Sequence, residues 1–496
     1  MMKTSRLSAT LITRFVTLLA ILASSSNCWA VIVYFNGSTS TDFLNGTNWT
    51  PAGVPGNNLV DIYSIDDGLN SMFSGGTTTV KGLRVGSAAK EHAFGETHFG
   101  RLTMTGGSLE VIGNNTLAVG RENLINYDAP VGADYNQDTV VDAADYVIWR
   151  NTLGSMIDLS ADGDGSGTIG APDYDIWRAG YGNRVNGGEI IMTGSSTLKA
   201  YGALIGERTI GLLSIGPVAV VDIRIWDTAV MPNQFGGSED MRIGGYGPSY
   251  AAENFEPGLD GRGLVNVQGT LNAKDLYVSE HGAKGEIQLS GGTVNLNGEL
   301  IMNFCGACGA DPGLLALRSA KVSIVGSSGS FKVGLDPDPM VVDPSLTLKR
   351  DIKANSPTAI FSFTADAGGV APIIVVDNSI SSEISGFANI AGAKLELNLD
   401  AYTSTSPLTL INAANGHHSG TFGAVTFLGS RTATVNYDVF NGNVFLSNFL
   451  GGAGMGSLAS AAVPEPSGLL MMTLALGLLL FSFSARAKRQ PARSWG

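Results

Sequence analysis

A short unit flanked by glycines recurs along this chain and constrains its fold more than any other feature. Each copy contains two brief strands in which apolar and polar residues alternate, and a third short apolar strand follows. Alternation of this kind buries one face of a strand, and glycine suits bends that need positive φ or close backbone approach. The first strands of four copies start at Gly100, Gly188, Gly263 and Gly285. Their third strands span 117–120, 203–206, 276–278 and 300–302.

A unit of this length cannot bury its own apolar face. The last two copies start only 22 residues apart, so neighbouring copies must stack into one continuous core. We therefore expect a mainly β protein whose body is a right-handed parallel β-helix or a related β-solenoid. A β-sandwich of short hairpins is the alternative, because the same alternation would serve it. With 66 glycines, 44% hydrophobic and 15% charged residues among 496, the chain is too apolar to be disordered and too glycine-rich to be mostly helical.

Between the first two copies, two acidic segments repeat each other at an offset of 28 residues. Each spans twelve residues, 134–145 and 162–173, and ends in an Asp followed by Tyr-x-Ile-Trp-Arg. Calcium takes about six to eight oxygen ligands, and a twelve-residue loop supplies them from positions 1, 3, 5, 7, 9 and 12. In the first segment these positions hold Asp134, Asn136, Asp138, the carbonyl of Val140, Asp142 and Asp145. In the second they hold Asp162, Asp164, Ser166, the carbonyl of Thr168, Gly170 and Asp173.

This pattern predicts two calcium sites; the alternative is that the segments are Asp/Gly turns facing water. Both depart from the ideal loop, in which position 6 is glycine because the chain turns sharply there. The first loop has Thr139 at that position, a β-branched residue that resists positive φ. The second has Gly167, but only the Ser166 hydroxyl at position 5 and no side-chain ligand from Gly170 at position 9. We therefore expect weak sites, with dissociation constants of roughly 10⁻⁴–10⁻³ M.

Each loop should lead into a short helix that begins after position 12. Pro172 fits the first turn of such a helix, since its missing N–H would have no partner there. The apolar residues at position 8, Val141 and Ile169, can pair the two loops back to back. Two antiparallel exit helices would bring the ends of the segment close together, so that it projects from the body as a separate inserted module.

The duplicated loop with its exit helix resembles the type I dockerin module, over residues 131–183. The resemblance implies calcium ligands at the loop positions given above, and docking of the pair onto a cohesin domain in cellulase assemblies. The family reads its partner with positions 10 and 11 of each loop, which are usually hydroxyl residues. Here those positions are Ala143 and Ala144, then Ala171 and Pro172. The calcium sites therefore carry over to this chain, whereas these positions put a cohesin-like partner in doubt.

The N-terminal residues 1–30 are typical of a secretory signal peptide. Lys3, Arg6 and Arg14 precede an apolar run at 15–23, and small residues suited to signal peptidase end at Ala30. A lipoprotein cysteine at Cys28 is the alternative.

The C-terminal segment 463–496 combines three features in order. Val463-Pro464-Glu465-Pro466 is followed by 18 residues without a charge, 468–485, which are just long enough to span a bilayer, and then by a basic tail. This arrangement resembles the PEP-CTERM sorting signal of bacterial exported proteins. The resemblance implies that the helix lies in the membrane before sorting and processing machinery acts near the Pro-Glu-Pro and releases the protein to the surface or matrix. An ordinary single-span anchor is the alternative, and it also leaves the body outside the membrane.

The charge distribution agrees with export. The formal net charge is −13, and because the leader and the segment from residue 463 each contribute +3, the body between them carries −19. Such an acidic body argues against nucleic acid as a partner. Two cysteines remain after leader removal, Cys305 and Cys308, and we interpret them as a glycine-rich structural turn in which a local disulfide is plausible.

These observations divide the chain into seven segments. Residues 48–56 resemble the opening module of autotransporter-like passenger repeats, and the strand-rich tail resembles the way such passengers close. The expected segments are a signal peptide (1–30), an N-terminal β module with the first solenoid rungs (31–130), the calcium module (131–183), solenoid repeats (184–335), a C-terminal β module (336–450), a linker (451–462) and the sorting signal (463–496).

Three functional hypotheses follow. The first is a non-catalytic exported surface or matrix protein in which calcium stabilises the inserted module or prepares it for a partner. The second is a component of a polysaccharide-degrading assembly, in which that module tethers the body to other proteins. The expected partner is a cohesin-like protein or a surface polysaccharide. The third is a β-helix polysaccharide lyase or glycoside hydrolase, which would need facing carboxylates. The irregular segment 226–256 is the one candidate cleft, no catalytic residue is assigned, and Glu286 and Glu299 are expected on outward positions where charge keeps the wall soluble.

Overall fold

The computed structural model describes residues 32–451 apart from internal gaps. These gaps are 59–60, 67, 87–98, 114–116, 122–132, 137–139, 157, 159, 164–165, 183–186, 208, 224–239, 246–260, 281–282, 305–318, 336–350, 355, 377–386, 414–417 and 439–440.

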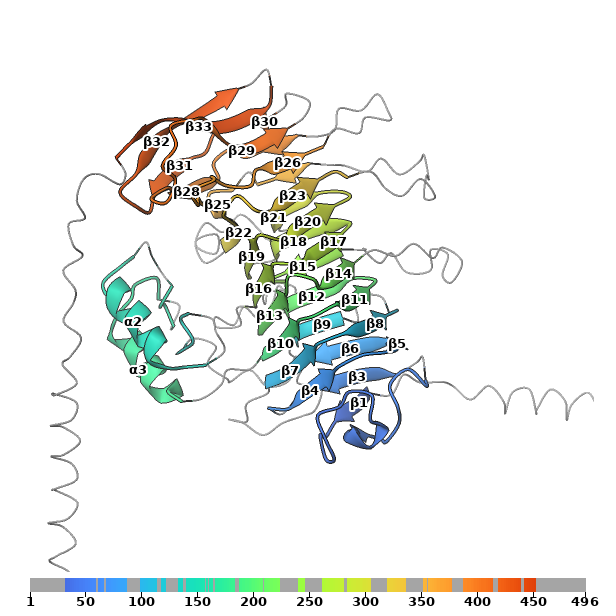
Figure 1. Cartoon of the computed structure of the whole chain (residues 1–496). Coiled ribbons are helices and arrows are strands. Elements are labelled where there is room, and N and C mark those ends of the chain that lie inside the picture. Colours follow the sequence, from blue (N-terminus) through green and yellow to red (C-terminus); the bar gives the residue numbers. More distant parts are fainter. Residues whose placement is uncertain are drawn as a thin grey trace, which may run out of the picture. The chain divides into compact units, whose positions relative to one another are not determined.

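The body is a β-helix-like coil with three strands in each turn (Figure 1). One turn consists of β7 (Phe99–Met104), β8 (Gly107–Val111) and β9 (Leu117–Arg121). Each of these strands pairs in parallel with the strand three places later in the chain, namely β10 (Gly187–Met192), β11 (Ser196–Ala200) and β12 (Ala203–Glu207). A sandwich of hairpins would pair consecutive strands in antiparallel fashion, so the parallel architecture is the one that the stacked repeats predicted.

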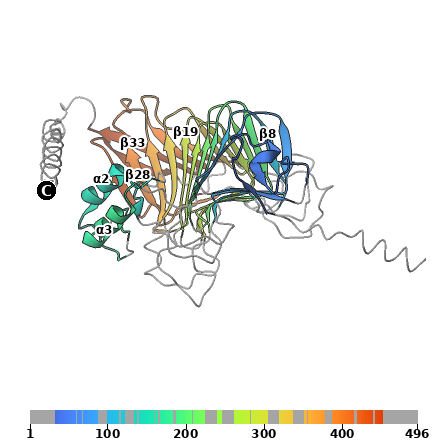
Figure 2. The ribbon, with the colours of Figure 1, turned by 90° about the horizontal axis from the view of Figure 1, so that it is seen from below.

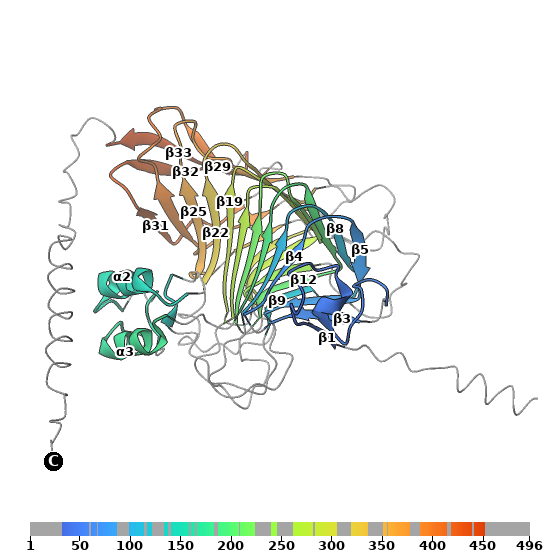
Figure 3. The ribbon, with the colours of Figure 1, turned by 60° about the horizontal axis from the view of Figure 1, so that its bottom comes forward.

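Three long sheets result, and their strands follow one another along the coil in sequence order except at two ends, where β2 precedes β1 and β33 precedes β32 (Figures 1, 2 and 3). Sheet 1 contains β2 (Trp49–Thr50), β1 (Ile32–Phe35), β3 (Ile62–Ile65), β6 (Gly82–Val85), β9, β12, β15 (Asp240–Ile243), β18 (Asp275–Glu280), β21 (Leu300–Phe304), β24 (Ile352–Lys353), β27 (Ala388–Asn389) and β30 (His418–Ser419). Sheet 2 contains β4 (Asn70–Phe73), β7, β10, β13 (Ile210–Ile215), β16 (Arg262–Val267), β19 (Lys284–Ser290), β22 (Ser319–Val325), β25 (Ala359–Thr364), β28 (Lys394–Asn398) and β31 (Ala424–Phe427). Sheet 3 contains β5 (Thr77–Val80), β8, β11, β14 (Val220–Ile223), β17 (Thr270–Ala273), β20 (Thr293–Leu296), β23 (Ser330–Val333), β26 (Ile373–Val375), β29 (Leu408–Ala413), β33 (Asn443–Leu450) and β32 (Thr432–Asp438).

The core is a column of apolar side chains that point inward from all three sheets. On sheet 2, for example, the central inward position of successive strands is apolar, and the residues that occupy it stand in register on neighbouring turns with at most 1% of their surface exposed. These residues are Leu102, Ile190, Leu213, Val265, Ile287 and Val322. The alternation in the sequence therefore produces the stacked core that it predicted.

Glycines form the corner between sheets 1 and 2. Gly206 lies near the end of a strand of sheet 1 with φ +78°, and a Cβ there would lie 2.1 Å from the carbonyl oxygen of Arg262. Gly211, near the start of the next strand of sheet 2, has equally little room, because its Cβ would lie 2.2 Å from the Gly206 nitrogen. No side chain fits at such distances, so the recurring glycines are required by close backbone approach.

Each end of the coil is closed by a different device. At the N-terminal end, Trp49 is buried against Phe35 and Phe43, with ring centroids 5.1 Å and 5.2 Å apart, and its Nε1 donates to the Phe43 carbonyl at 2.8 Å. The short 3₁₀ helix η1 (Gly46–Asn48) precedes this tryptophan. At the C-terminal end, β33 pairs in antiparallel fashion with both β29 and β32. Antiparallel closure limits the open edge that a growing parallel coil would otherwise expose.

Two features of the coil differ from the sequence-based expectations. A further turn, formed by β13, β14 and β15, lies between the recognised copies, and β15 falls within the segment 226–256 that we expected to be irregular. In addition, β25 and β28 extend sheet 2 beyond residue 335, so the last strands share their core with the repeats before them.

Several predicted segments lie outside the described residues. They include the leader 1–30, the linker and sorting signal from 452 onwards, Cys305 and Cys308. Among the residues that the structure does describe, none of the helices is long and apolar enough to cross a membrane.

Candidate metal centre

Two short helices follow the acidic loops and lie side by side (Figures 1 and 3). They are α2 (Ala143–Thr152) and α3 (Ala171–Gly180). Each begins at loop position 10, three residues before the start that we predicted, so that prediction was wrong. The reason is visible in the first helix, where the Asp142 side chain accepts from the Ala144 N–H at 2.7 Å and Asp145 accepts from the Asp142 N–H at 2.8 Å. This reciprocal capping starts the helix inside the loop.

The first loop closes on a fully buried carboxylate. Asp145, at position 12, accepts from the Asn136 N–H through Oδ1 at 2.9 Å and from the Asp142 N–H through Oδ2 at 2.8 Å. It thereby joins positions 3 and 9 of the loop to the start of α2. Asp134, at position 1, is also fully buried, with 0% of its surface exposed. Of the other predicted ligands, Asn136, Val140 and Asp142 are described, whereas Asp138 lies outside the described residues.

The second loop repeats this closure. Asp173, also 0% exposed, accepts from the Gly163 N–H at 2.7 Å and from the Gly170 N–H at 2.6 Å. Asp162, at position 1, accepts from the backbone of Ser166 at 3.0 Å and of Gly167 at 2.9 Å. Gly167 has φ +76°, which is the left-handed conformation expected for position 6.

The remaining ligand positions of the second loop are partly described. The Ser166 hydroxyl donates to the Thr168 carbonyl at 3.1 Å, so two predicted ligands lie together, while Asp164 is outside the described residues. Pro172 occupies the first turn of α3, as predicted. Within the described part of the chain, no three His, Cys, Asp or Glu side chains converge as a metal cluster. One predicted carboxylate ligand of each loop, Asp138 in the first and Asp164 in the second, lies outside that described part.

The helices exchange hydrogen bonds with each other's loops. Trp149 of α2 donates from Nε1 to the carbonyl of Gly170, and Trp177 of α3 donates to the carbonyl of Asp142, both at 2.8 Å. Both acceptors occupy loop position 9. Each acidic loop is therefore held by the helix of the other half, and the 28-residue sequence repeat becomes an approximate twofold arrangement.

Position 8 follows the same crossed pattern. The Gly154 N–H, beyond α2, donates to the carbonyl of Ile169 at 2.9 Å, and the Gly182 N–H, beyond α3, donates to that of Val141 at 2.8 Å. The two apolar side chains belong to separate buried clusters. The sequence suggested that these two residues pair the loops back to back, but in the structure each carbonyl instead accepts from the chain beyond the helix of the opposite half.

Aromatic side chains fill the interface between the helices. Tyr146 lies 5.1 Å from Trp177 and Trp149 lies 5.0 Å from Tyr174, measured between ring centroids. The two tyrosines are 6.2 Å apart in an edge-on arrangement. Because such contacts add to the stability gained by burial, the repeated Tyr-x-Ile-Trp-Arg serves to join the two halves.

One further hydrogen bond crosses the interface in a single direction. The buried hydroxyl of Tyr135, at position 2 of the first loop, donates to the carbonyl of Asp173, at position 12 of the second, at 2.6 Å. The counterpart of Tyr135 in the second loop is Gly163, which has no side chain. The first loop therefore positions a predicted ligand residue of the second without the reverse contact.

The donor chemistry of both loops fits a hard divalent cation. Every side-chain and carbonyl ligand predicted in them is an oxygen, and calcium prefers such a set. Burial of a carboxylate is unfavourable unless its charge is balanced. Asp134, Asp145 and Asp173 are fully buried, and a cation at the centre of each loop would supply that balance.

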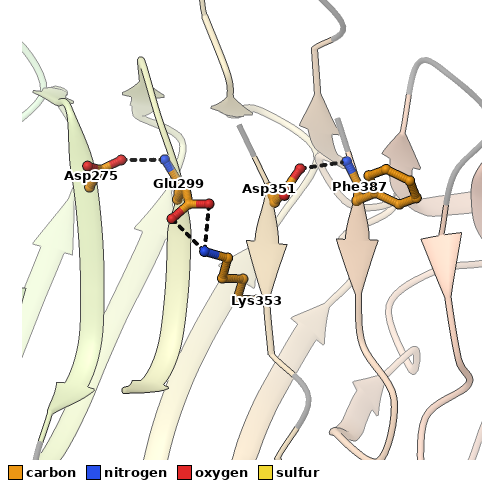
Figure 4. A network of polar contacts seen from close by, with 5 residues as sticks. All are labelled: Asp275, Glu299, Asp351, Lys353 and Phe387. Carbon is orange, nitrogen blue, oxygen red and sulfur yellow. Dashed lines mark hydrogen bonds and ion pairs between the residues drawn. The ribbon is translucent and has the colours of Figure 1, made fainter. Parts of the chain in front are cut away.

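A second group of titratable residues lies on the coil, along sheet 1. Asp240, Asp275, Glu299 and Asp351 occur on four successive turns, each immediately before the first apolar residue of its strand. The Asp275 carboxylate accepts from the Glu299 N–H at 2.6 Å, and the Asp351 carboxylate accepts from the Phe387 N–H at 3.0 Å (Figure 4). We call these four residues the carboxylate row.

The carboxylate row corrects one sequence-based expectation. Glu299 is only 9% exposed, and Lys353 on the next turn donates to its Oε2 at 2.8 Å and forms an ion pair with its Oε1 at 2.8 Å, so its role is structural pairing and not solubility. Burial raises the pKa of Glu299, and Lys353 opposes that rise. Burial also raises the pKa of Asp275 to about 6; the Glu299 N–H opposes this rise, and the neighbouring Asp240 carboxylate adds to it. The shared signal, an acidic residue just before the first apolar residue of the third strand in these four turns, was present in the sequence.

Comparison with known proteins returned no match: no family model, no curated protein and no solved structure is significantly similar to this chain.

Proposed function

We propose that the chain is an exported, non-catalytic cell-surface or extracellular-matrix protein whose β-helix-like body carries an inserted, dockerin-like module that binds two calcium ions. The observation that supports this most directly is the closure of both loops on a fully buried Asp at position 12, Asp145 and Asp173. A capping role alone would explain one oxygen of each carboxylate. The second oxygen accepts from an N–H near the start of the loop, and this bond closes the loop in the way that a metal site needs.

The ligands follow from the loop positions. The first ion would be held by the side chains of Asp134, Asn136, Asp138, Asp142 and Asp145 and the carbonyl of Val140. The second would be held by the side chains of Asp162, Asp164, Ser166 and Asp173 and the carbonyl of Thr168. The ion contributes positive charge at the centre of each loop. Because the position 12 carboxylates also cap α2 and α3, ion binding and helix formation would be a single event.

Export would place the body where calcium is abundant. The basic leader, the strongly acidic body and the C-terminal sorting segment support this location. Weak sites, with dissociation constants of roughly 10⁻⁴–10⁻³ M, would then be filled. The module would be stable outside the cell and loosened wherever calcium is scarce.

Attachment to a protein partner is a second candidate role for the same module. Loop positions 10 and 11, Ala143 and Ala144 in one half and Ala171 and Pro172 in the other, are all exposed. Their small apolar side chains favour a partner that buries apolar surface over one that reads hydroxyl groups. A partner of that kind would capture the body in calcium and release it in EDTA.

Calorimetric titration of the body, residues 31–450, with calcium tests the proposal. The parent should show two weak sites, and Asp145→Ala and Asp173→Ala should each lose one. Asp222→Ala is the matched control, since it removes a carboxylate from β14 of the acidic body and should leave both sites in place. The far-ultraviolet circular dichroism should also lose helical signal in EDTA. A parent that binds no calcium, or an EDTA spectrum identical to the calcium spectrum, would refute the proposal.

A further inference from the structure

A buried arginine of the coil contacts the first calcium loop. Arg262 begins β16 on sheet 2 and is only 5% exposed. Its Nη1 donates to the carbonyl of Asp134, at loop position 1, at 3.1 Å, across 128 residues of sequence. A guanidinium that is withdrawn from water needs acceptors to offset its desolvation. This contact therefore fixes the backbone of the first predicted ligand against the wall of the coil.

Apolar packing reinforces the contact. Ala133, which precedes position 1, and Val141, which occupies position 8 of the first loop, form a buried cluster with Ile210 of β13, and all three are 1% exposed. Leu212, further along β13, packs against the same cluster. Ile210 and Arg262 stand directly in register on neighbouring strands. The first loop thus rests on the ends of two adjacent strands.

The second loop makes no corresponding contact among the described residues of the apolar clusters. Its equivalents of Ala133 and Val141 are Ala161 and Ile169, and their cluster contains Tyr135 and partly buried residues of α2 and α3. All of these belong to the insert. The approximate twofold symmetry of the insert is therefore broken by the coil, which supports the first loop.

The two loops also differ in charge, and the more negative loop is the one that contacts the coil. The first loop has carboxylates at positions 1, 5, 9 and 12, and the second has them at positions 1, 3 and 12. With a divalent cation bound, the first loop keeps one more negative charge than the second. The guanidinium of Arg262 lies beside the loop with the larger excess.

We propose that the first calcium loop is the attachment point of the insert, and that calcium binding there and docking of the loop against β13 and β16 stabilise each other. This inference rests on the proposed calcium binding. Coupling between two such events is reciprocal, so calcium tightens the docking by the same factor by which docking tightens calcium binding. The insert is then a calcium-dependent attachment on the wall of the coil, in contrast to the separate projecting module that the sequence suggested.

The test measures each site separately in residues 31–450. Asp173→Ala leaves the first site alone, and Asp145→Ala leaves the second. Adding Arg262→Ala to the first background should weaken calcium binding roughly 5- to 100-fold. Adding it to the second background should change the calcium affinity less than about twofold, because the effects of substitutions at distant, independent sites are nearly additive. Lys321→Ala is the matched control, because it removes a positive charge from sheet 2 at a site paired with Glu396.

A second variant and a second readout guard against a folding defect. Ile210→Ser weakens the apolar contact with the first loop. It should leave the main core intact, because Ile210 does not belong to the main apolar cluster of the coil. It should also weaken the first site selectively. In the parent, calcium should increase hydrogen-exchange protection at the start of β16, and Asp145→Ala should abolish that increase. Intact calcium affinity at the first site in both Arg262→Ala and Ile210→Ser would overturn the coupling alone, whereas a parent without saturable calcium binding would overturn the proposed function and the coupling with it.

Discussion

Asp275 in the carboxylate row should make the stability of the coil depend on pH, and replacing its carboxyl with an uncharged group should remove this contribution to the pH dependence. Its carboxylate lies beside Asp240 on one neighbouring turn and accepts from the Glu299 N–H on the other. Burial, with the Asp240 charge, raises the pKa of Asp275 from 3.8 to about 6. The folded protein therefore binds this proton more tightly than the unfolded chain does. The stability that the protonated form provides is fully present below about pH 3.8 and is lost as the pH rises through 6.

The magnitude follows from the size of the pKa difference. Each unit corresponds to about 1.4 kcal/mol, so a rise from 3.8 to about 6 represents a destabilisation of about 3 kcal/mol above pH 6. Native domains are stable by roughly 5–15 kcal/mol in total, which makes this a measurable fraction. An asparagine in place of Asp275 would keep an oxygen that accepts from the Glu299 N–H, and its amide group could donate to the Asp240 carboxylate. Asp275→Asn should therefore stabilise the coil by up to about 3 kcal/mol at pH 7–8 and by little at pH 4.

Denaturant unfolding of residues 31–450 at several pH values between 4 and 8 measures this difference directly. The gap between variant and parent should widen as the pH rises and level off above 6. Asp222→Asn, which removes a charge from β14 on sheet 3, controls for the general effect of reducing the net negative charge of the body. A variant whose difference from the parent is the same at every pH, or is matched by the control, would refute the reasoning.

Three further outcomes are expected. Hydrogen bonds from the backbone and side chain of Ser327 lower the pKa of Asp366. Asp366→Asn should therefore lower the melting temperature at neutral pH, whereas Asp275→Asn should raise the stability there. The difference from the parent should vanish as the pH falls below about 3.8. Tyr135→Phe removes the bond to the Asp173 carbonyl and should weaken the second calcium site about 2- to 10-fold in calorimetry, since a net hydrogen bond contributes roughly 0.5–1.5 kcal/mol. Gly206→Ala places a Cβ 2.1 Å from the Arg262 carbonyl oxygen at positive φ, and it should lower the stability in chemical denaturation by about 3 kcal/mol or more.

The parts of the fold that depend on local pattern could be predicted from the sequence. The strands that start near Gly188 and Gly263 alternate apolar and polar residues clearly, and each becomes a strand of sheet 2. The third strands were also recognisable, because short apolar runs recur at the same place in each copy. The brevity of the repeat favoured stacking of the copies, since so short a unit cannot bury its own apolar face. The strand pairing of the structure then decided between a parallel coil and a sandwich of hairpins.

The missed turn shows where local pattern fails. Its third strand, β15, consists of Asp240, Met241, Arg242 and Ile243, and two of its four residues are charged. Only inward-pointing Met241 and Ile243 carry the apolar signal. A strand this short is recognised by its pairing with β12 and β18, which are remote in sequence. The carboxylate row was missed for the same reason: its residues become neighbours only once the register is known.

The helix starts in the insert were wrong because one residue has two roles. Asp145 and Asp173 were predicted as the last ligands of their loops, with each helix to follow. In the structure each is also the third residue of its helix and caps the residue three places earlier. The loop and the helix therefore overlap, and a prediction that assigned each residue to one element could not place the boundary.

The contact between the insert and the coil could not be inferred from the repeat at all. The two acidic loops are similar in sequence, and Trp149 and Trp177 make equivalent hydrogen bonds to them within the insert. Arg262, 128 residues beyond Asp134, distinguishes one loop from the other. A buried guanidinium loses hydration that an acceptor must offset, and an apolar cluster between the insert and β13 adds stability only while it is kept out of water. Both lie on the side of the first loop, so the calcium binding proposed there would depend on the whole body and not on the insert alone.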